Sequence, residues 1–369
     1  RKIAERTGID PDAVSVSVTH LHTGGPTWAG LASKRDPEYL EFYTERVAQA
    51  GVEAYQSMRP ARIGFAKGEL RGISFVRRFY MKNGYIQTNP APGDPNVVRP
   101  TGEPDYTVAV ARVEEQDGTL MAVLTNFALH ADSVGGTKIC ADFPGVLSAE
   151  IKKTYGDKVV SLFFNGPCGN VNHINRDAPP VSGEPKMYER LGLALFEKVS
   201  ELLGTVKTAD SAPVQVVTKR FLINLRRPTA EQLEWAHAVQ EGRPTMLEEE
   251  QGNSMFVPEG FARHILVLQE KQEFVRELEI KAVRIGDGVL AAWPGEVFAE
   301  FGKEVRAAYS DQTILIAELT NGSIGCYIPT KESFGMGGYE PRLTGGANAE
   351  ETTGEQIVSG TLELLKQIK

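Results

Sequence analysis

Two histidines at the end of a predicted strand are the residues of this chain best suited to chemistry. The segment Thr19-His20-Leu21-His22-Thr23-Gly24-Gly25-Pro26 follows the alternating apolar and polar residues 14–18. Such alternation predicts a strand, and Gly-Gly-Pro predicts the loop that ends it. Imidazole nitrogens are common zinc ligands, and open α/β sheets carry their sites at strand ends. His20 and His22 are therefore candidate metal ligands, with a histidine held by backbone hydrogen bonds as the structural alternative.

Polar or titratable side chains follow four other predicted strands. They are His130 after 120–129, the loop 165–175 after 159–164, Glu296 after 289–293, and Tyr327 after 314–319. If these strands are mostly parallel, their carboxyl ends meet on one face of the sheet. Two imidazoles and a carboxylate there would suit zinc, which keeps a position for water in catalytic sites. The structural alternatives are an acid in the first turn of a helix for Glu296 and a tyrosine at the core's edge for Tyr327.

Three further features bear on where the chemistry lies. The loop 166–169 lacks the spacing of a dinucleotide fingerprint or a P-loop. We predict instead that the backbone of 166–170 forms a cradle for an oxyanion. His237 and His264 lie within helical patterns, and we assign them to structure or surface rather than to the site.

The elements that must position these residues alternate between strand and helix patterns. This order predicts an α/β class with a mixed, largely parallel central sheet flanked by helices. Asp36-Pro37 and Asp142-Phe143-Pro144 each predict a helix that begins with an Asp cap. Asn83-Gly84 predicts a hairpin turn. Residues 229–271 have helical periodicity and few strand signals, and we interpret them as a helical insertion. Further strands are expected over 61–70, 73–81, 106–113, 214–225 and 278–285, and helices over 185–203 and 355–368.

Length and composition limit the class of protein. A chain of 369 residues predicts one large α/β domain with elaborations, or two closely packed domains. Its net charge of -8, without a basic stripe, argues against a nucleic-acid partner. No apolar run approaches the ~20 residues needed to span a bilayer. The three cysteines Cys140, Cys168 and Cys326 form neither a disulfide framework nor a zinc knuckle.

The chain opens at Arg1 inside a helical pattern, so we expect that an amino-terminal part of the domain precedes it. The sequence specifies neither the compartment, cytoplasmic or secreted, nor the oligomeric state.

The motifs taken in order resemble those of the neutral (non-lysosomal) ceramidase family, in its amino-terminal catalytic domain. Residues 19–26 resemble the family's THTHSGP, residues 126–130 its NWFAVH, and residues 139–145 its ISGDNKG. Residues 164–175 follow its serine-bearing loop ending in GDVSPN, residues 294–296 its proline-and-glutamate motif, and residues 327–332 with Tyr339-Glu340 its YITTYEEY and YE pair. The resemblance covers nearly the whole chain and implies one ceramidase-like catalytic domain over 1–369, with the helical insertion 229–271 inside it.

The resemblance also implies roles for individual residues. It implies that zinc is coordinated by His20, His130, Glu296 and Tyr327. It places His22 and Tyr339 beside the scissile carbonyl, as hydrogen-bonding or proton-transfer groups. Arg78 matches a family arginine of the active site, with the neighbouring Arg77 as the competing match.

The chain departs from the family pattern at its nucleophile. The family's serine falls on Asn172, whose amide cannot act as that nucleophile, so hydrolysis should depend on metal-activated water. Asn172 and His173 would then orient the substrate, and His173 could serve as general acid to the leaving group. The alternative for His173 is a loop histidine that only hydrogen-bonds backbone.

We therefore expect a zinc-dependent hydrolase of an amide or ester bond in a small molecule. Because the chain stops soon after Tyr339, without the family's carboxyl-terminal β-domain, long-chain ceramide is not the expected substrate. One alternative is a non-catalytic zinc-binding or ligand-binding protein of the same fold, suggested by the missing serine. Another is a zinc amidohydrolase or peptidase for small polar substrates, which Arg77, Arg78 and Arg176 near the rim would favour.

Overall fold

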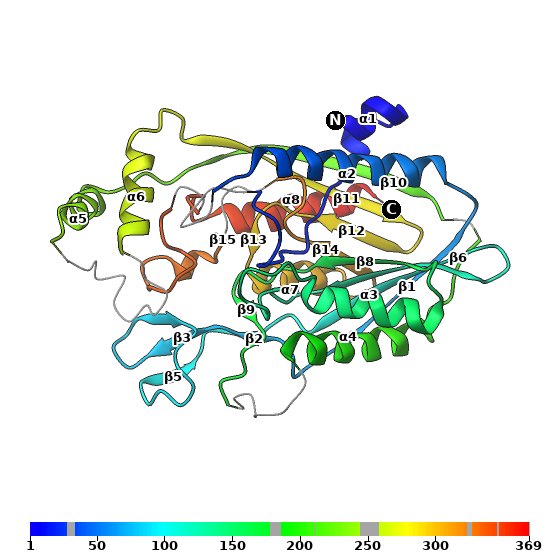
Figure 1. The fold of residues 1–369 in the computed structure, drawn as a ribbon, viewed down its shortest axis with the longest axis horizontal. Coiled ribbons are helices and arrows are strands. Elements are labelled where there is room, and N and C mark those ends of the chain that lie inside the picture. The colour runs from blue at the N-terminus through cyan, green and yellow to red at the C-terminus, as the bar shows by residue number, and fades with distance from the viewer. Residues whose placement is uncertain are drawn as a thin grey trace.

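Two four-stranded sheets form the centre of the protein (Figure 1). The computed structural model describes residues 1–27, 34–177, 186–210, 212–243, 258–322, 327–344 and 347–368. The first sheet has the order β1 (Arg62–Glu69), β6 (Thr107–Glu114), β7 (Leu120–Phe127), β8 (Val160–Asn165). The second has the order β10 (Val214–Asn224), β11 (Val275–Ile285), β12 (Gly288–Ala292), β14 (Thr313–Ala317). Short strands form three small sheets, β2 (Phe75–Val76) with β9 (Val171–Asn172), β4 (Ile86–Thr88) with β3 (Arg78–Met81) and β5 (Val97–Pro100), and β13 (Glu296–Val297) with β15 (Tyr327–Ile328).

The mixed α/β class is confirmed, but the expectation of a largely parallel sheet is wrong. In each large sheet only one pairing is parallel, β7 with β8 and β12 with β14. The other pairings are antiparallel. Short turns join β6 to β7 and β11 to β12, whereas long connections join β1 to β6 and β10 to β11. The two parallel pairs nevertheless precede the loops that carry His130, Asn165, Glu296 and the segment after β14.

The side chain of Asn126 joins the two sheets. Its Nδ2 donates to the carbonyl oxygens of Phe164 and Ile316, each at 2.9 Å, and its Oδ1 accepts from the N–H of Ile316 at 2.9 Å. The buried amide thus takes the place of a peptide group between β8 and β14. The carboxyl ends of the parallel strands consequently lie at one shared edge, where the N–H of Glu318 donates to the carbonyl of Asn165 at 3.0 Å.

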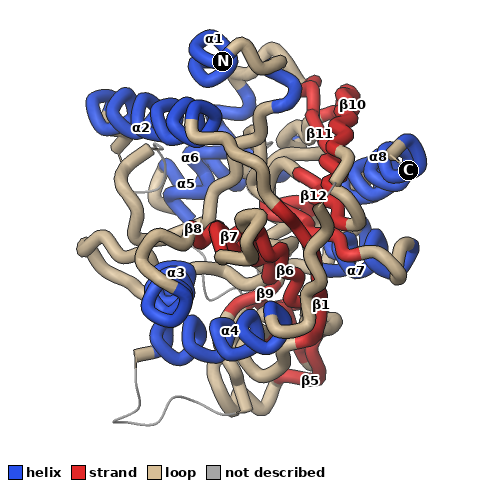
Figure 2. Tube along the Cα trace, turned by 90° about the vertical axis from the view of Figure 1, so that its right-hand side faces the viewer, coloured by secondary structure: helices blue, strands red, loops and turns tan. Residues whose placement is uncertain are grey.

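Helices cover the outer faces of both sheets (Figure 2). The helices of the described residues are α1 (Lys2–Thr7), α2 (Pro37–Gln56), α3 (Asp142–Tyr155), α4 (Met187–Leu203), α5 (Ala230–Gln240), α6 (Pro258–Gln269), α7 (Ala299–Ala308) and α8 (Thr353–Gln367), with short 3-10 turns at Pro11–Ala13 and Lys331–Ser333. Helices α3 and α4 bury Leu147 and Leu195 against the first sheet. Helices α7 and α8 bury Phe301 and Ile357 with Trp293 against the second. None of the described helices is long and apolar enough to cross a bilayer.

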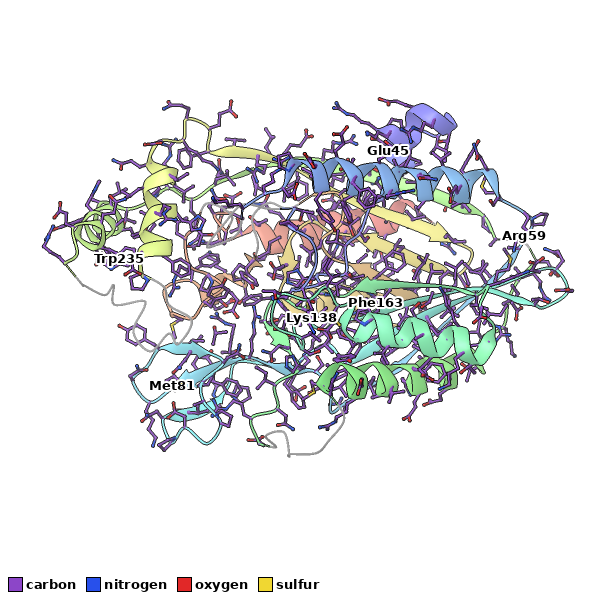
Figure 3. All side chains as sticks on the ribbon, in the orientation of Figure 1. Glu45, Arg59, Met81, Lys138, Phe163 and Trp235 are labelled. Carbon is purple, nitrogen blue, oxygen red and sulfur yellow. The ribbon has the colours of Figure 1, made fainter. Side chains whose placement is uncertain are left out.

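Helices α5 and α6 form a separate pair at one end of the molecule (Figures 1 and 3). Their small core contains Trp235, Phe261 and Ile265, and Tyr339 packs against it. Both helices lie within the stretch 229–271 that the sequence indicates as helical. Residues 244–257 of that stretch lie outside the described residues, and its status as an insertion stays a prediction.

Local signals gave mixed results. Asp36 caps α2 as expected, since its Oδ1 accepts from the N–H of Tyr39 at 3.0 Å, and Asn83-Gly84 turns β3 into β4. The cap expected from Asp142 is wrong. Asp142 has a φ of 49° and is the first residue of α3, whose N-cap is Ala141 and has no side-chain hydrogen bond. The Asp142 carboxylate accepts from Ser133 and the N–H of Val134, as well as from the N–H of Phe143.

The strand expected over 14–19 is also absent. The segment makes an isolated bridge, between Ser17 and Thr320. The neighbour it meets is the irregular turn after β14, and its pairing is completed by a side chain: the N–H of Val16 donates to Oδ1 of Asn321 at 2.8 Å. A turn cannot offer the regular ladder that a strand needs.

Candidate metal centre

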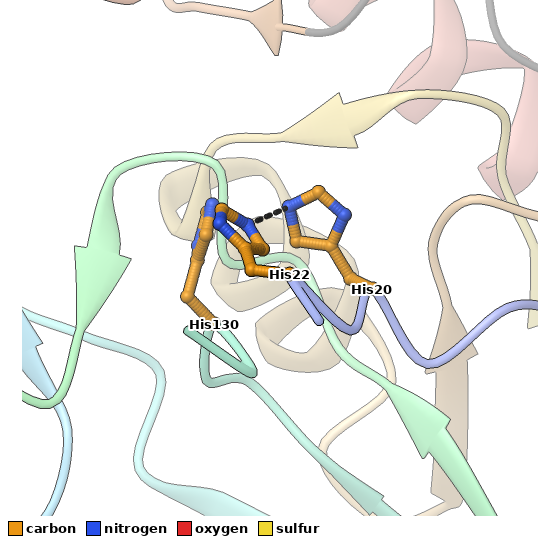
Figure 4. Close-up of side chains that lie close together, drawn as sticks. All are labelled: His20, His22 and His130. Atoms are coloured by element: carbon orange, nitrogen blue, oxygen red, sulfur yellow. Dashed lines mark hydrogen bonds between the residues drawn. The ribbon is translucent and has the colours of Figure 1, made fainter. Parts of the chain in front are cut away.

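Three histidines from two distant parts of the chain come together at the shared edge of the sheets (Figure 4). His20 and His22 lie on the loop after Ser17, and His130 lies on the loop after β7. One ring nitrogen of each lies within 4.8 Å of those of the other two, and Nε2 of His20 is 3.3 Å from Nε2 of His22. His130 is fully buried, His20 is partly buried, and His22 is exposed on the outer side. The group could hold a metal ion.

Glu296 reaches the same point from the loop after β12. Its Oε2 lies 3.1 Å from Nε2 of His20 and 3.2 Å from Nε2 of His130. Burial acts to raise the pKa of Glu296, but the two histidines outweigh it and hold that pKa well below its usual range. Burial acts to lower the pKa of His20, and the charge of Glu296 outweighs it in turn. Glu296 is thus an ionised carboxylate at the centre of the cluster.

Backbone carbonyls set the tautomer of His130. Its Nδ1 lies 2.8 Å from the carbonyl oxygen of Cys168 and 2.9 Å from that of Val171. Because carbonyl oxygens only accept, Nδ1 carries the proton, and Nε2 turns its lone pair toward Glu296. Burial, followed by the charge of Arg77, lowers the pKa of His130 to about 4. The ring is therefore neutral near pH 7 and oriented as a metal-ligating histidine is.

The cluster has the chemistry of a cation site. Oε2 of Glu296 is buried and has no hydrogen-bond partner of proper geometry among the described residues. Its nearest neighbours include the unprotonated Nε2 of His130, so two electron pairs face each other at 3.2 Å. A cation placed among these atoms would turn that repulsion into attraction. The residues present thus fit a bound metal ion.

Tyr327 and Tyr339 lie together beside this cluster. Strand β15 runs parallel to β13, which makes Tyr327 the register partner of Glu296. The guanidinium carbon of Arg77 lies 5.3 Å from the centre of the Tyr327 ring. The Tyr327 and Tyr339 rings meet edge to face, with 5.6 Å between their centres. Both tyrosines are half-buried. The Tyr339 ring also meets the ring of Phe261 in α6 edge to face.

Of the two candidate arginines, Arg77 is the one that contacts the histidines. Its Nη1 lies 3.4 Å from Nε2 of His130, and its Nη2 donates to the carbonyl of Gly169 at 2.8 Å. Arg78 instead donates to Glu340, at 2.5 Å. Glu340 also accepts from Nε of Arg77 at 2.8 Å, so one buried carboxylate is shared by both guanidinium groups. Glu340 was missed as a site residue, although it follows Tyr339 directly in the sequence.

His173 is paired with an acid. Its Nδ1 lies 2.9 Å from Oδ1 of Asp132. Burial acts to raise the pKa of Asp132, but His173 outweighs it and the pKa falls to about 2. The interpretation of His173 as a histidine that bonds only backbone is therefore wrong. Asp132 was missed, although its place two residues after His130 is a signal that could have found it.

The side chain of Asn172 makes its hydrogen bonds within the protein. It is buried in β9, its Nδ2 donates to Oδ1 of Asn89 at 2.9 Å, and its Oδ1 accepts from the N–H of Ile174 at 3.1 Å. These bonds hold the loop that carries His173, so Asn172 can act on a substrate through His173.

Three N–H groups of the loop 166–170 are engaged within the protein, which argues against the oxyanion cradle predicted there. The N–H groups of Gly166 and Gly169 donate to the carbonyls of Phe127 and Val297, each at 2.9 Å, and that of Cys168 donates to Glu318 at 3.2 Å. Pro167 has no N–H to offer. The loop works through its carbonyls instead, which orient His130 and Arg77.

The preference for an acidic or polar substrate, expected from three arginines near the rim, stays a prediction. Arg77 and Arg78 share Glu340, and Arg176 donates to the carbonyls of Pro90 and Ala91, at 2.8 Å and 2.5 Å. These arginines are thus already engaged within the protein.

The lowered pKa of His130 predicts how the stability of the metal-free protein depends on pH. The unfolded chain takes up a proton at this ring near pH 6.5, whereas the folded protein resists it down to about pH 4. The unfolded state therefore gains protons first, and about 3 kcal/mol of stability should be lost as the pH falls from 6.5 to 4. Urea unfolding in chelator, with His130→Ala as reference, measures this. A difference between the two proteins that is constant across this window would contradict it.

Comparisons with known proteins agree on one fold. No model of a known protein family matches the chain. Neutral ceramidase A of Dictyostelium discoideum is 28% identical over 136 residues, which is 34% of this chain and 18% of that protein. The crystal structure of neutral ceramidase from Pseudomonas aeruginosa superposes on 98% of this chain and 63% of its own, with a TM-score of 0.68 and 16% identity. A ceramidase complexed with C2 superposes on 99% of this chain and 64% of its own, with a TM-score of 0.67 and 16% identity. The chain thus spans less than two thirds of each protein it resembles.

Proposed function

We propose that this neutral ceramidase-like domain is a zinc-dependent hydrolase of an amide or ester bond in a small molecule. The observation that carries the proposal is the buried Oε2 of Glu296, which lies between Nε2 of His20 and Nε2 of His130 with no donor of proper geometry. Two imidazoles and a carboxylate are a donor set that zinc takes in catalytic sites. The fold shared with neutral ceramidases supports a hydrolase rather than another user of zinc.

Four residues would hold the metal. His20, His130 and Glu296 meet directly, and Tyr327 lies beside Glu296 in the paired strands β13 and β15. When bound, zinc supplies a Lewis acid that makes water a nucleophile near neutral pH and polarises a carbonyl. The remaining roles fall to side chains of the chain itself.

His22 and Tyr339 are placed to contact the scissile group. His22 is exposed, 3.3 Å from His20, so a substrate can reach it from solvent. The Tyr339 ring meets the Tyr327 ring edge to face, and Tyr339 is half-buried. An imidazole and a phenol beside the cluster can donate hydrogen bonds to a developing oxyanion, a function for which the N–H groups of Gly166, Cys168 and Gly169 are already engaged.

His173 would deliver the proton to the leaving group. The Asp132 carboxylate fixes its Nδ1, which leaves Nε2 to exchange a proton with substrate. Asp132 also acts electrostatically on His22 and His130, so the pair lies beside the cluster. Arg78, held away from the cluster by Glu340, would position Arg77 through that acid rather than touch substrate.

A cavity beside His173 suits a small apolar group. It has a volume of about 260 Å³, and its lining includes Ile73, Phe75, Met187 and Leu191. An apolar cavity of about 150 Å³ already accommodates benzene, so this one fits a short acyl or alkyl group rather than a long lipid chain. The size supports an amide or ester smaller than long-chain ceramide as substrate.

The test combines metal analysis with turnover. We expect about one zinc per chain by elemental analysis, and hydrolysis of short-chain amides or esters that a chelator stops and added zinc restores. Zinc without turnover on any member of such a panel would favour the second candidate, a non-catalytic zinc-binding or ligand-binding protein. The buried Asn172 at the position of the family's serine is the observation that favours that candidate.

Replacing Asn172 by alanine tests the route of attack. We expect activity to fall by roughly 10- to 100-fold, as is typical when a residue that supports a metal site by hydrogen bonds is lost, while the zinc content is unchanged. The reason is that Asn172 positions the His173 loop and contacts no candidate ligand in the described structure. Mass spectrometry of the parent protein with substrate is the companion measurement. A trapped acyl-protein, with activity abolished in Asn172→Ala, would show that the nucleophile belongs to the chain.

A further inference from the structure

The residues just after β14 contact the segments that lead to His20 and Glu296 and the loop that orients His130. The N–H of Glu318 donates to the carbonyl of Asn165 at 3.0 Å, and that of Leu319 to Gly295 at 3.2 Å. The N–H of Asn321 donates to Val16 at 3.0 Å. These bonds reach the loop that orients His130, the loop that carries Glu296 and the segment that leads to His20. We name residues 318–321 the junction segment.

The side chain of Glu318 makes the central contacts of the junction segment. It is fully buried. Its Oε2 accepts from the N–H of Cys168 at 3.2 Å and from the N–H of Val297 at 2.9 Å, and its Oε1 accepts from Sγ of Cys168 at 3.0 Å. One carboxyl group therefore ties the loop 166–170 to strand β13.

Each of these contacts is one step away from a candidate ligand. Cys168, held by Glu318 at its N–H and its thiol, presents its carbonyl to Nδ1 of His130. Val297, held by Glu318 at its N–H, follows Glu296 directly. Movement of the Glu318 carboxyl would shift the carbonyl that orients one ligand and the backbone that carries the other.

We propose that Glu318 is a positioning residue, which sets the geometry of His130 and Glu296 for metal binding by accepting hydrogen bonds from Cys168 and Val297. The inference rests on the proposed zinc site and adds a residue to which neither the sequence motifs nor the relatives assign a role. Fold stability alone does not favour an acid at this place, because burial and the nearby Glu296 raise the pKa of Glu318 to about 8.

Two substitutions at this position test whether its hydrogen bonds set the zinc affinity. In Glu318→Gln the amide oxygen can still accept from both N–H groups, and the amide nitrogen faces the thiol. In Glu318→Ala all three bonds are lost. We expect Glu318→Ala to weaken zinc binding by about 10- to 100-fold in competition with a chromophoric chelator, and Glu318→Gln to stay within a few-fold of the parent. The unfolding temperature of the metal-free proteins is measured in parallel.

A matched control comes from the first sheet. Glu114 is another nearly buried acid, bonded to Arg112 and Thr208, and none of its bonds reaches the cluster. Glu114→Ala should lower the unfolding temperature without changing zinc affinity. This variant corrects for any general effect of removing a buried carboxylate.

Three results would overturn the inference. If Glu318→Ala is less stable but binds zinc as tightly as the parent, Glu318 has a purely structural role. If Glu318→Gln loses as much affinity as Glu318→Ala, acceptance of these hydrogen bonds is not what sets the affinity. If the parent protein itself binds no zinc, the proposed function fails, and the positioning role fails with it; in the first two results the zinc site stands.

Discussion

Replacing His130 by alanine is expected to remove bound zinc from the protein. His130 is fully buried and its Nε2 is aimed at Glu296 by two backbone carbonyls, so no other side chain can take its place without rebuilding the loop. Loss of a direct ligand should lower the affinity for zinc by more than the roughly 100-fold caused by losing a residue that hydrogen-bonds to a ligand. Zinc occupancy after dialysis should therefore fall from about one per chain to near the background, and hydrolysis should fall with it.

The same measurement on two other histidine variants makes the result specific. His20→Ala should also lose zinc, since its Nε2 is 3.1 Å from Glu296. His237→Ala, an exposed histidine in α5 outside the cluster, should keep it. Full occupancy in both His20→Ala and His130→Ala would exclude this cluster as the metal site, and the proposed hydrolase would lose its basis.

Replacing Glu340 by alanine is expected to cause the largest loss of stability. Glu340 is fully buried and is shared by Arg77 and Arg78, which are 4% and 1% exposed. Burial acts to raise the pKa of Glu340, but these two arginines outweigh it and lower the pKa. Its removal would leave both buried guanidinium groups without the carboxylate they share, and loss of one partner of a buried pair costs about 3–5 kcal/mol.

Urea unfolding of the metal-free protein measures this cost. The control is Glu115→Ala, which breaks the exposed pair of Glu115 with Arg59 at the end of the molecule opposite α5 (Figure 3). Solvent screens that pair, and we expect a change of no more than about 1 kcal/mol. Equal losses for the two variants would show that the buried arginines find other partners, or that water reaches them.

Much of the fold could be read from local patterns. The helix that begins at Asp36-Pro37 and the turn at Asn83-Gly84 follow from short-range preferences, which hold wherever nothing else competes. Asp142 shows the limit of that reasoning, because its carboxylate is taken by the loop at Ser133. The direction of the strands was misjudged because strand patterns do not specify how neighbouring strands pair.

The residues of the candidate site were likewise predictable only in part from the sequence. The sequence predicts that His20, His130 and Glu296 meet. The structure places Oε2 of Glu296 within 3.2 Å of Nε2 of both histidines, and their role as metal ligands stays a prediction. Glu318 and Glu340 could not have been found from spacing. Their partners lie 150 and 263 residues away, at Cys168 and Arg77, and no local pattern reports a contact of that span.

The contact between the segment before His20 and the junction segment has a consequence for biosynthesis. The hydroxyl groups of Ser17 and Thr320 are 2.6 Å apart although 303 residues separate them. His20 must therefore wait until Thr320 has been synthesised before its supporting turn exists. The cluster cannot be assembled from the amino-terminal half alone, and a nascent or truncated chain would hold its imidazoles apart. Metal loading would then mark the end of folding rather than guide its start.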